Sequence, residues 1–200
     1  MIWFEPPSQL VGWEFNAPGV LDSKMIDFLN EHATNNPLSL QPAEVNNDAK
    51  ADKNIEQSYR RSEIMFLTDM EHFSNLYNII IGAVLEVNNT HFKYALNHIE
   101  PLQYSVYRSE NMGCYDVHTD SYLRNTSGFN RKVSFSILLD DPADFEGGDL
   151  LLHTASEPIK ADMKKGDMFL FPSFIPHSVT PVTHGVRRSL VGWVYGPNFV

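Results

Sequence analysis

The sequence predicts an α+β protein that consists mainly of β-strands. Two stretches with helical spacing lie in the first half of the chain, and the second half is made of short β-rich runs separated by Gly, Pro and Asp. Helices followed by a series of strands are typical of the α+β class. Because no helical pattern separates the strands, antiparallel pairing in a sandwich or an open barrel is favoured over a parallel sheet.

Length and composition indicate one domain. The 200 residues are 42% hydrophobic, which is enough to bury well over half of the surface that the unfolded chain exposes. We expect a single domain over residues 1–200, in which residues 1–100 supply helical support and the first strands and residues 101–200 form the strand core.

The first predicted helix begins near Leu21. Large side chains recur at helical spacing from Leu21 through Met25, Phe28 and Leu29 to His32. The polar stretch that follows, residues 34–58, has Asn pairs and two prolines but little apolar periodicity, and it predicts a long loop. Loops of this length are often functional or mobile, so whether it covers a binding site stays open.

The second predicted helix carries the clearest pattern in the chain. Thr68 and Glu71 have the spacing of a capping box, and the helix is expected to end near Asn88. The residues that mark one face of this helix are Phe73, Leu76, Ile80, Ala83, Val84 and Val87.

Five β-rich runs follow this helix. They cover residues 102–108, 132–139, 149–152, 167–171 and 188–195. Each is bounded by turn-forming residues, which is the pattern of short strands in a β-rich core.

Charge and cysteine content narrow the function classes. A formal net charge of −10 disfavours nucleic acid as a partner, because phosphate binding needs a clustered basic surface. We expect no membrane span and no signal peptide, since no apolar run approaches the length that either needs. The single cysteine, Cys114, fits a reducing compartment, so the sequence predicts a cytoplasmic protein.

The residues with the most chemical content are His118, Asp120 and His177. In an extended strand residues two apart point to the same side, so His118 and Asp120 can bind one ion together, and the third ligand must come from elsewhere in the fold. Two imidazoles and one carboxylate on one face of a metal leave open positions, which is the arrangement of non-heme Fe(II) oxygenases. A single histidine in a β-rich chain is more often structural, and only the surrounding motifs distinguish these two.

Those motifs carry a resemblance to a known family. The segments YRSENMGCYDVHTD, VSFSILLDD, FEGGDLLL, KKGDMFLFP and PHSVTPVTHGVRRSLVGW occur in this order. Together they resemble the prolyl 4-hydroxylase-like branch of the Fe(II)/2-oxoglutarate-dependent dioxygenases. The resemblance implies a double-stranded β-helix, a jelly roll of two sheets related to the cupins, with supporting helices before it.

The resemblance also implies roles for individual residues. His118, Asp120 and His177 match the iron ligands of the catalytic centre. Arg187 matches the residue that binds the distal carboxylate of 2-oxoglutarate, and a guanidinium suits a carboxylate because it offers two parallel charge-assisted bonds. Ser189, on the same side of the strand, and Tyr107 match cosubstrate contacts.

Two aromatic residues match positions that line the substrate side. These are Tyr115 and Trp193, although both could equally be ordinary core aromatics. The stretch of residues 121–131, directly after the predicted ligands, is rich in turn formers and reads either as a lid over substrate or as an inert surface loop.

The implied activity is hydroxylation with Fe(II), 2-oxoglutarate and O2, giving succinate and CO2, with ascorbate as an accessory reductant. The implied substrate is a prolyl residue in a peptide or protein. A free amino acid or small metabolite is an alternative, as is a non-catalytic cupin-like barrel that binds a metal or ligand. The chain lacks both the HxH pair typical of cupins and the RxNxTxR run typical of nucleic-acid demethylases in this superfamily. Its oligomeric state is not indicated.

Overall fold

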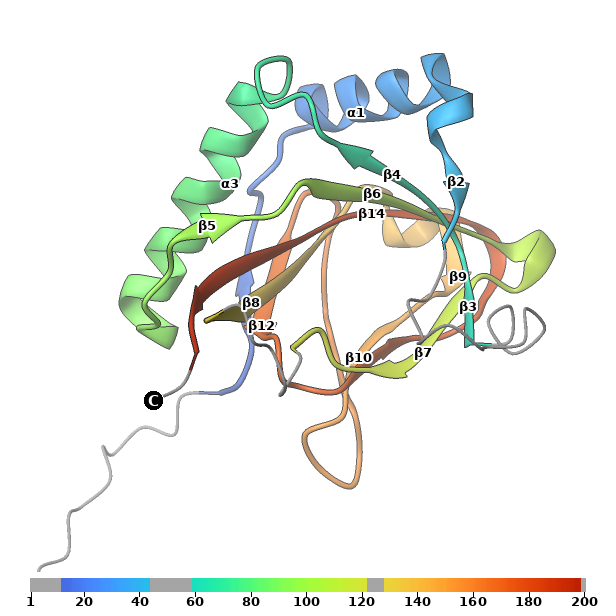
Figure 1. The fold of residues 1–200 in the computed structure, drawn as a ribbon. Coiled ribbons are helices and arrows are strands. Elements are labelled where there is room, and N and C mark those ends of the chain that lie inside the picture. The colour runs from blue at the N-terminus through green and yellow to red at the C-terminus, as the bar shows by residue number, and fades with distance from the viewer. Residues whose placement is uncertain (1–11, 44–58, 122–127, 199–200) are drawn as a thin grey trace, which may run out of the picture.

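Two antiparallel sheets that face each other form the body of the protein (Figure 1). The computed structural model describes residues 12–43, 59–121 and 128–198. In this part of the chain the larger sheet runs in the order β1 (Phe15–Ala17), β12 (Met168–Pro172), β8 (Phe129–Leu138), β14 (Val182–Pro197), β6 (Leu102–Arg108), β4 (Glu63–Leu67) and β2 (Gln41–Pro42), with β5 (His98–Ile99) and β9 (Phe145–Gly147) also pairing with β14. The smaller sheet runs in the order β11 (Ile159–Lys160), β10 (Leu150–Leu152), β13 (His177–Val179), β7 (Cys114–His118) and β3 (Arg60–Arg61). This is the predicted α+β jelly roll.

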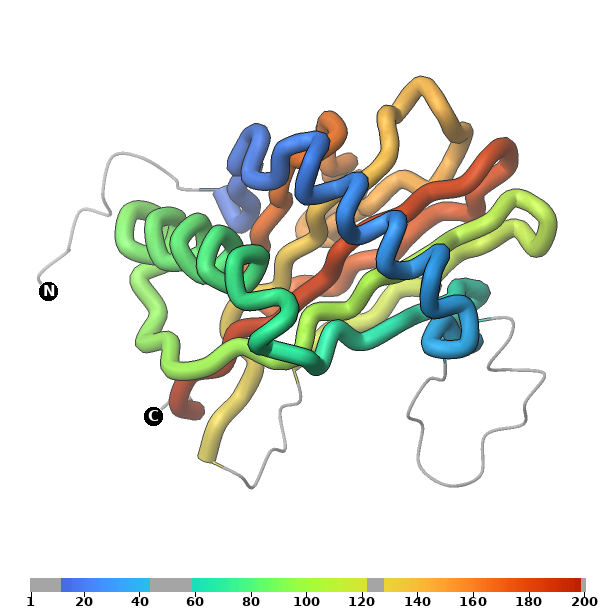
Figure 2. The backbone as a smooth tube through the Cα atoms, turned by 90° about the horizontal axis from the view of Figure 1, so that it is seen from above, coloured from blue at the N-terminus to red at the C-terminus, as the bar shows by residue number. Residues whose placement is uncertain are grey.

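Two helices cover the outer face of the larger sheet. These are α1 (Ser23–Asn35) and α3 (Ser74–Val87), and Figure 2 shows α1 crossing over the strands with α3 beside it. The Asp22 side chain caps α1 by accepting a hydrogen bond from the Met25 N–H at 2.8 Å, which satisfies one of the free donors at the helix start. Short helical turns complete the described chain at η1 (Pro37–Ser39), η2 (Asn88–Phe92), η3 (Ser109–Asn111) and η4 (Pro142–Asp144).

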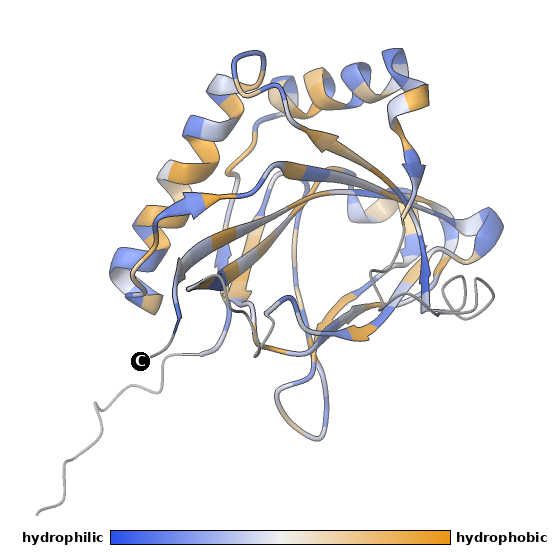
Figure 3. Cartoon of the chain, viewed as in Figure 1, coloured by the Kyte–Doolittle hydropathy of each residue, from blue (hydrophilic) through white to orange (hydrophobic). Residues whose placement is uncertain are grey.

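The larger sheet separates an apolar side from a polar side by simple strand alternation. In β6, Leu102, Tyr104 and Val106 belong to the core beneath the helices, whereas the intervening Gln103 and Tyr107 line the space between the sheets. Figure 3 shows the same mixture of hydrophobic and hydrophilic residues along the helices and strands. The helices therefore stabilise the sheet from behind and leave its inner face for chemistry.

A second, smaller core lies between the sheets. Its members include Leu150 and Leu152 of β10, Phe169 and Phe171 of β12, and Val179 of β13. This cluster holds the two sheets together beside the polar inner face, so the strands that carry the predicted site residues have rigid support.

The helix predictions are confirmed with two corrections. On α3 the predicted apolar face is buried or half-buried, but Thr68 and Glu71 form no capping box. The N-cap residue of α3 is Phe73, which makes no side-chain cap, and Asp69 closes the turn before the helix by accepting a hydrogen bond from the His72 N–H at 3.0 Å. On α1 the predicted Phe28 lies at the edge of the core, 37% exposed, where it contacts His72 and Phe73.

The prediction of a long loop over residues 34–58 is partly wrong. Its described beginning contains η1 and the short strand β2, which pairs with β4 and forms an edge of the larger sheet. Two-residue strands leave no periodic signal, so sequence patterning missed β2 as well as β3 and β5. Residues 44–58 lie outside the described part of the chain, as do residues 122–127 of the other candidate lid.

Within the described ranges, no helix has the length and apolar character needed to cross a membrane.

Candidate metal and cosubstrate site

One cavity between the two sheets contains all the residues that the sequence singled out. It has a volume of about 1080 Å³. The predicted site residues that line it are His118, Asp120, His177, Arg187, Ser189, Tyr107, Tyr115 and Trp193. Residues far apart in the sequence thus share one space, with the histidines on the smaller sheet and the arginine on the larger one.

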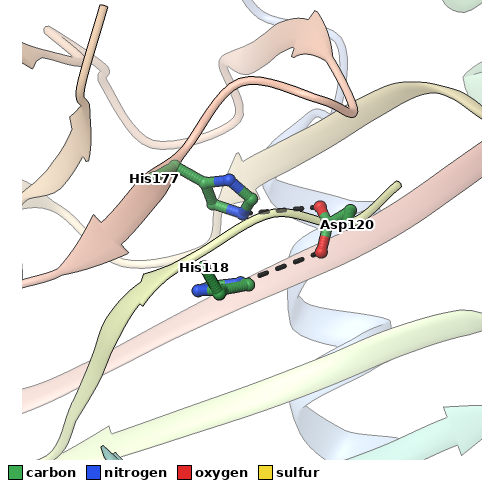
Figure 4. Close-up of side chains that lie close together, drawn as sticks. All are labelled: His118, Asp120 and His177. Carbon is green, nitrogen blue, oxygen red and sulfur yellow. Dashed lines mark ion pairs between the residues drawn. The ribbon is translucent and has the colours of Figure 1, made fainter. Parts of the chain in front are cut away.

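Strand register brings the two histidines together. His118 and His177 are directly opposite each other on the neighbouring antiparallel strands β7 and β13. Asp120 lies just beyond the end of β7, where its N–H donates to the Ser173 carbonyl at 3.0 Å. The chain leaves the strand after His118, yet Asp120 still turns to the same side, and Figure 4 shows its carboxylate facing both rings.

The three side chains converge on a common point. His118 Nε2 lies 3.8 Å from Asp120 Oδ1, and His177 Nε2 lies 3.4 Å from Asp120 Oδ2. Ligand atoms of the three residues all lie within 4.8 Å of one another. Within the described residues they are the single group of this kind, and the spacing suits a metal ion bound between them.

Hydrogen bonds fix which nitrogen of each ring faces that point. His118 Nδ1 contacts the Asp116 carbonyl at 2.8 Å, and His177 Nδ1 contacts the Ile175 carbonyl at 2.9 Å. A carbonyl can only accept, so each Nδ1 carries the proton and each Nε2 lone pair is free for a metal. Backbone hydrogen bonds of this kind are the usual way of orienting imidazole ligands.

The electrostatics of the triad favour a bound cation. Burial, followed by the proximity of His177, lowers the pKa of His118 to about 4, so this ring is neutral at pH 7. Burial by itself would raise the pKa of Asp120, but the two histidines and a hydrogen bond from Ser134 lower it. A buried, ionised carboxylate beside a neutral imidazole calls for a positive charge between them.

Two serines and a tryptophan surround the Asp120 carboxylate. Ser134 Oγ donates to Asp120 Oδ2 at 2.7 Å and is itself 2.9 Å from Ser173 Oγ. Trp193 Nε1 is buried without a hydrogen-bond partner in the described structure, and it lies close enough to help lower the pKa of Asp120. The indole N–H thus lies near the Asp120 carboxylate and helps to keep it ionised.

Arg187 is a buried cation without an anion. Its side chain is 3% exposed, and its Nη1 donates to Ser189 Oγ at 3.2 Å. Tyr107, its cross-strand neighbour, has its ring 5.5 Å from the guanidinium carbon. No described carboxylate lies within ion-pair distance of Arg187. Burial lowers the pKa of its guanidinium, because the charged form loses contact with water. A guanidinium buried in this way is stabilised by an anionic ligand.

One of two adjacent glycines makes room for this arginine. Gly148 has a φ of +65°, and a Cβ there would lie 2.7 Å from Arg187 Cδ. Gly147 has a φ of +73°, and its Cβ would lie 2.0 Å from the Pro181 carbonyl oxygen. The Gly-Gly motif is therefore required by both backbone conformation and space.

The predicted substrate residues lie on either side of the triad. Tyr115 stacks on the His118 ring with centroids 3.6 Å apart, and the guanidinium of Arg60 lies 4.3 Å from the same ring centroid. The guanidinium carbon of Arg131 lies over the Trp193 ring, 4.0 Å from the ring centroid. Burial raises the pKa of Tyr115 to about 12, so its hydroxyl remains protonated. A substrate role for either aromatic stays a prediction.

Sequence reasoning missed three further residues of this cavity. Ser134 had one available signal, because it interrupts an apolar strand at an inward-facing position. Arg60 and Arg131 had none, since each is placed by contacts with aromatic rings distant in the chain. Arg131 is paired with Glu100, whereas Arg60 has no described carboxylate partner.

The donor set and the buried arginine fit Fe(II) and 2-oxoglutarate. Two imidazole nitrogens and one carboxylate oxygen are the donors that a non-heme iron centre uses, and they approach from one side. Arg187 supplies the counter-charge for a cosubstrate carboxylate in the same cavity. A jelly roll with this facial triad defines the class of non-heme, metal-dependent oxygenases.

Comparison with known proteins points to one superfamily. Residues 102–195, just under half of the chain, match the model of the 2OG-Fe(II) oxygenase superfamily. The matched range contains the triad and Arg187 as well as the strands that carry them.

Curated relatives match about half of the chain or somewhat more. A PKHD-type hydroxylase of Prochlorococcus marinus is 36% identical over 93 residues, which are 46% of this chain and 41% of that protein. A PKHD-type hydroxylase of Escherichia coli is 33% identical over 129 residues, which are 60% of this chain and 56% of that protein. The aligned part thus spans about half the length of the curated relatives.

Solved structures share the fold over nearly the whole chain. A prolyl-4-hydroxylase from Pseudomonas putida has a TM-score of 0.67 at 18% identity and covers 93% of this chain and 94% of its own. A prolyl hydroxylase from Trichoplax adhaerens, in complex with a peptide fragment of hypoxia inducible factor, has a TM-score of 0.70 at 17% identity, with coverage of 92% and 83%. The double-stranded β-helix fold predicted from the sequence is confirmed.

Proposed function

We propose that this protein is an Fe(II)- and 2-oxoglutarate-dependent hydroxylase that acts on a prolyl residue of a peptide or protein. The observation that carries the proposal is the convergence of His118, Asp120 and His177 in one cavity with the unpaired Arg187. Together they provide a cation site and an anion site in one cavity, which is what a dicarboxylic cosubstrate that also binds the metal needs.

The bound iron, with 2-oxoglutarate and O2, supplies the oxidation that converts a substrate C–H to C–OH while 2-oxoglutarate becomes succinate and CO2. The chain's own residues position the reactants. His118 and His177 present Nε2 lone pairs because their Nδ1 protons are held by carbonyls. Arg187 fixes the cosubstrate through its distal carboxylate, and the surrounding sheets limit access of water.

The assignment to prolyl substrates is supported by the names of the relatives. The curated relatives are PKHD-type hydroxylases, and one solved neighbour holds a peptide. Tyr115 and Trp193 both line the cavity that holds the triad, where their rings contribute to its apolar wall. A free amino acid or small metabolite as substrate, and a barrel that binds metal without turnover, are the alternatives that the experiments below distinguish.

Two finer points belong to the same proposal. Ascorbate is proposed as a reductant that restores Fe(II) after turnover without substrate. A cytoplasmic location is proposed because the buried Cys114 is a free thiol and no cysteine partner exists in the chain.

The first experiment tests the chemistry without a known substrate. Anaerobic addition of Fe(II) and 2-oxoglutarate should produce a weak visible metal-to-ligand charge-transfer band, and admission of air should release succinate slowly. His177→Ala should abolish both signals, because two ligands remain at the metal position. A protein that binds metal but gives neither band nor succinate would be a non-catalytic barrel.

The second experiment tests the substrate class. Proline-containing peptides are incubated with the Fe(II)-loaded enzyme, 2-oxoglutarate and air, and mass spectrometry detects the gain of one oxygen. Hydroxylation of a peptide supports the proposal, whereas succinate release that is stimulated by free proline or another amino acid but by no peptide would move the assignment to small substrates.

A further inference from the structure

Arg60 is a second arginine of the cavity that lacks a counter-charge. It lies on β3, the edge strand of the smaller sheet, directly opposite Tyr115 of β7. Cross-strand partners in an antiparallel pair point to the same face, so the guanidinium lies over the tyrosine ring, 4.3 Å from its centroid. His118 stacks on the same ring at 3.6 Å, which leaves the opposite ring face for Arg60. One aromatic ring therefore separates Arg60 from a predicted metal ligand.

The side chain of Arg60 is held but not neutralised. It is 9% exposed, and its Nε donates to Ser62 Oγ at 2.9 Å. Its two Nη atoms make no hydrogen bond to a described residue, and no described carboxylate lies within ion-pair distance. Stacking on Tyr115 fixes the guanidinium in place with its Nη donors free, which is a preorganised site for an anion.

The other charges of the cavity are already matched. Arg131 is paired with Glu100. Asp120 faces the metal position, and Arg187 faces the cosubstrate end. Among the charged residues that line the described cavity, Arg60 remains without an assigned partner. It lies on the Tyr115 side, where the proposed function places the substrate.

We propose that Arg60 binds a carboxylate of the substrate, so that the substrate is a prolyl compound with a negatively charged carboxylate next to the reacting residue. This inference rests on the proposed function and specifies its substrate class. The carboxylate has two possible sources, the C-terminal carboxylate of a peptide that ends in proline or an acidic side chain that follows an internal proline.

The test uses two matched pairs of peptides. The first pair is acetyl-Gly-Ala-Pro with a free C-terminal carboxylate and the same peptide as an amide. The second pair is acetyl-Ala-Pro-Glu-Ala-amide and its Gln analogue. Binding is measured by titration against the protein loaded with Fe(II) and 2-oxoglutarate without O2, and KM and kcat are then measured in air by mass spectrometry.

In one of the two pairs, the charged peptide should bind roughly tenfold to a hundredfold more tightly than its neutral partner, because a hydrogen-bonded contact with a charged group is lost in the neutral one. The pair that shows this preference identifies the source of the carboxylate. Arg60→Gln should abolish the preference by raising the KM for the charged peptide, and Arg60→Lys should retain part of it.

Arg61 provides the matched control. It is the next residue on β3 and faces the other side, where its guanidinium donates to the Met112 carbonyl at 2.9 Å. Arg61→Gln should therefore leave the preference for the charged peptide unchanged.

Two results would overturn the inference. One is a wild-type protein that binds charged and neutral peptides equally in both pairs. The other is an Arg60→Gln variant that weakens charged and neutral peptides by the same factor, which would make Arg60 only a support for Tyr115. If Arg60→Gln fails to fold, the wild-type preference and the Arg60→Lys variant decide the question. Failure of the proposed function is seen separately, as absence of succinate and hydroxylated product, because peptide binding is measured without turnover.

Discussion

Two adjacent arginines on β14 have different roles because strand alternation points their side chains to opposite faces of the sheet. Arg187 points into the cavity and has no anionic partner among the described residues, whereas Arg188 points to the other side and forms an ion pair with Asp140 at 2.7 Å. The same residue type thus has two different tasks at neighbouring positions, one toward a ligand and one within the fold.

Arg187→Ala should weaken binding of 2-oxoglutarate by roughly 2–5 kcal/mol, because the distal carboxylate would be buried without its partner. The affinity is measured by calorimetry with the metal-loaded protein in the absence of O2. Arg188→Ala is the matched control and should leave the affinity unchanged, since its ion pair lies outside the cavity. Equal affinities of the wild type and the Arg187 variant would contradict the assignment of Arg187 as the cosubstrate anchor.

A second residue-scale prediction concerns Ser134, which holds one oxygen of the Asp120 carboxylate. Ser134→Ala should lower the affinity for the metal by roughly tenfold to a hundredfold, because groups that orient a ligand contribute that much. The measurement is a titration with Mn(II) or Co(II), which needs no turnover. Ser136→Ala changes the next inward-facing serine of β8, for which no contact with Asp120 exists, and should have little effect. Similar losses in both variants would mean that Ser134 acts through the strand and not through Asp120.

At the scale of elements, helices and strands with a long periodic pattern were predictable from the sequence. Two-residue strands that form only by pairing with a neighbouring strand were not. The predicted strand at residues 102–108 coincides with β6 (Leu102–Arg108), in which residues of the core alternate with residues that line the cavity. By contrast, β2 and β3 have two residues each and exist because a neighbouring strand offers hydrogen bonds. No local pattern encodes such pairing, so the position of Arg60 beside Tyr115 could not be read from the sequence.

Local sequence patterns also had only a partial hold on the geometry of the site, because part of it depends on contacts between distant segments. The HxD spacing predicted that His118 and Asp120 share a side, and they do, although β7 ends at His118. The cause is the Ser173 carbonyl, which accepts from the backbone N–H of both Asp120 and Ser121 and turns the chain. Motif order located the residues, whereas tertiary hydrogen bonds supply the geometry.

The turn between β9 and β10 gives a prediction at this scale. Gly148→Ala should destabilise the fold by about 1–3 kcal/mol and also weaken binding of 2-oxoglutarate, since a Cβ would both strain a φ of +65° and press on Arg187 Cδ at 2.7 Å. Gly19→Ala is the matched control, because Gly19 has a φ of +61° with no atom within 4 Å of the added Cβ. Chemical denaturation measures stability in both variants, and calorimetry measures cosubstrate binding. A Gly148 variant that loses stability but binds 2-oxoglutarate normally would show that the glycine serves the turn alone.

For the whole molecule, the site joins the two sheets. The histidine ligands lie on β7 and β13 of the smaller sheet, and Arg187 lies on β14 of the larger one. The larger sheet is supported by helices on its outer face, whereas the smaller sheet contacts it through the inner cluster and the site residues. Ligands that bind both sheets therefore connect the less supported half of the fold to the more supported half.

This arrangement predicts two separable increments of thermal stability. A ligand that binds the native state at a hundred times its Kd stabilises it by about 2.7 kcal/mol. For a domain of this size each kcal/mol raises the Tm by about 2–4 °C, so metal should raise it by roughly 5–10 °C. With Mn(II) present, 2-oxoglutarate should raise it further, and a chelator should reverse both increments.

The variants assign each increment to its residues. His177→Ala should remove the response to metal and, with it, the metal-dependent response to 2-oxoglutarate, because the ligand set is broken. Arg187→Ala should keep the response to metal and lose most of the additional response to 2-oxoglutarate, since the anchor on β14 is absent. Thermal unfolding followed by circular dichroism gives the Tm in each case. If 2-oxoglutarate raised the Tm of the Arg187 variant as much as that of the wild type, the cosubstrate would not be joining the two sheets through β14, and the proposed orientation of the cosubstrate in the cavity would be wrong.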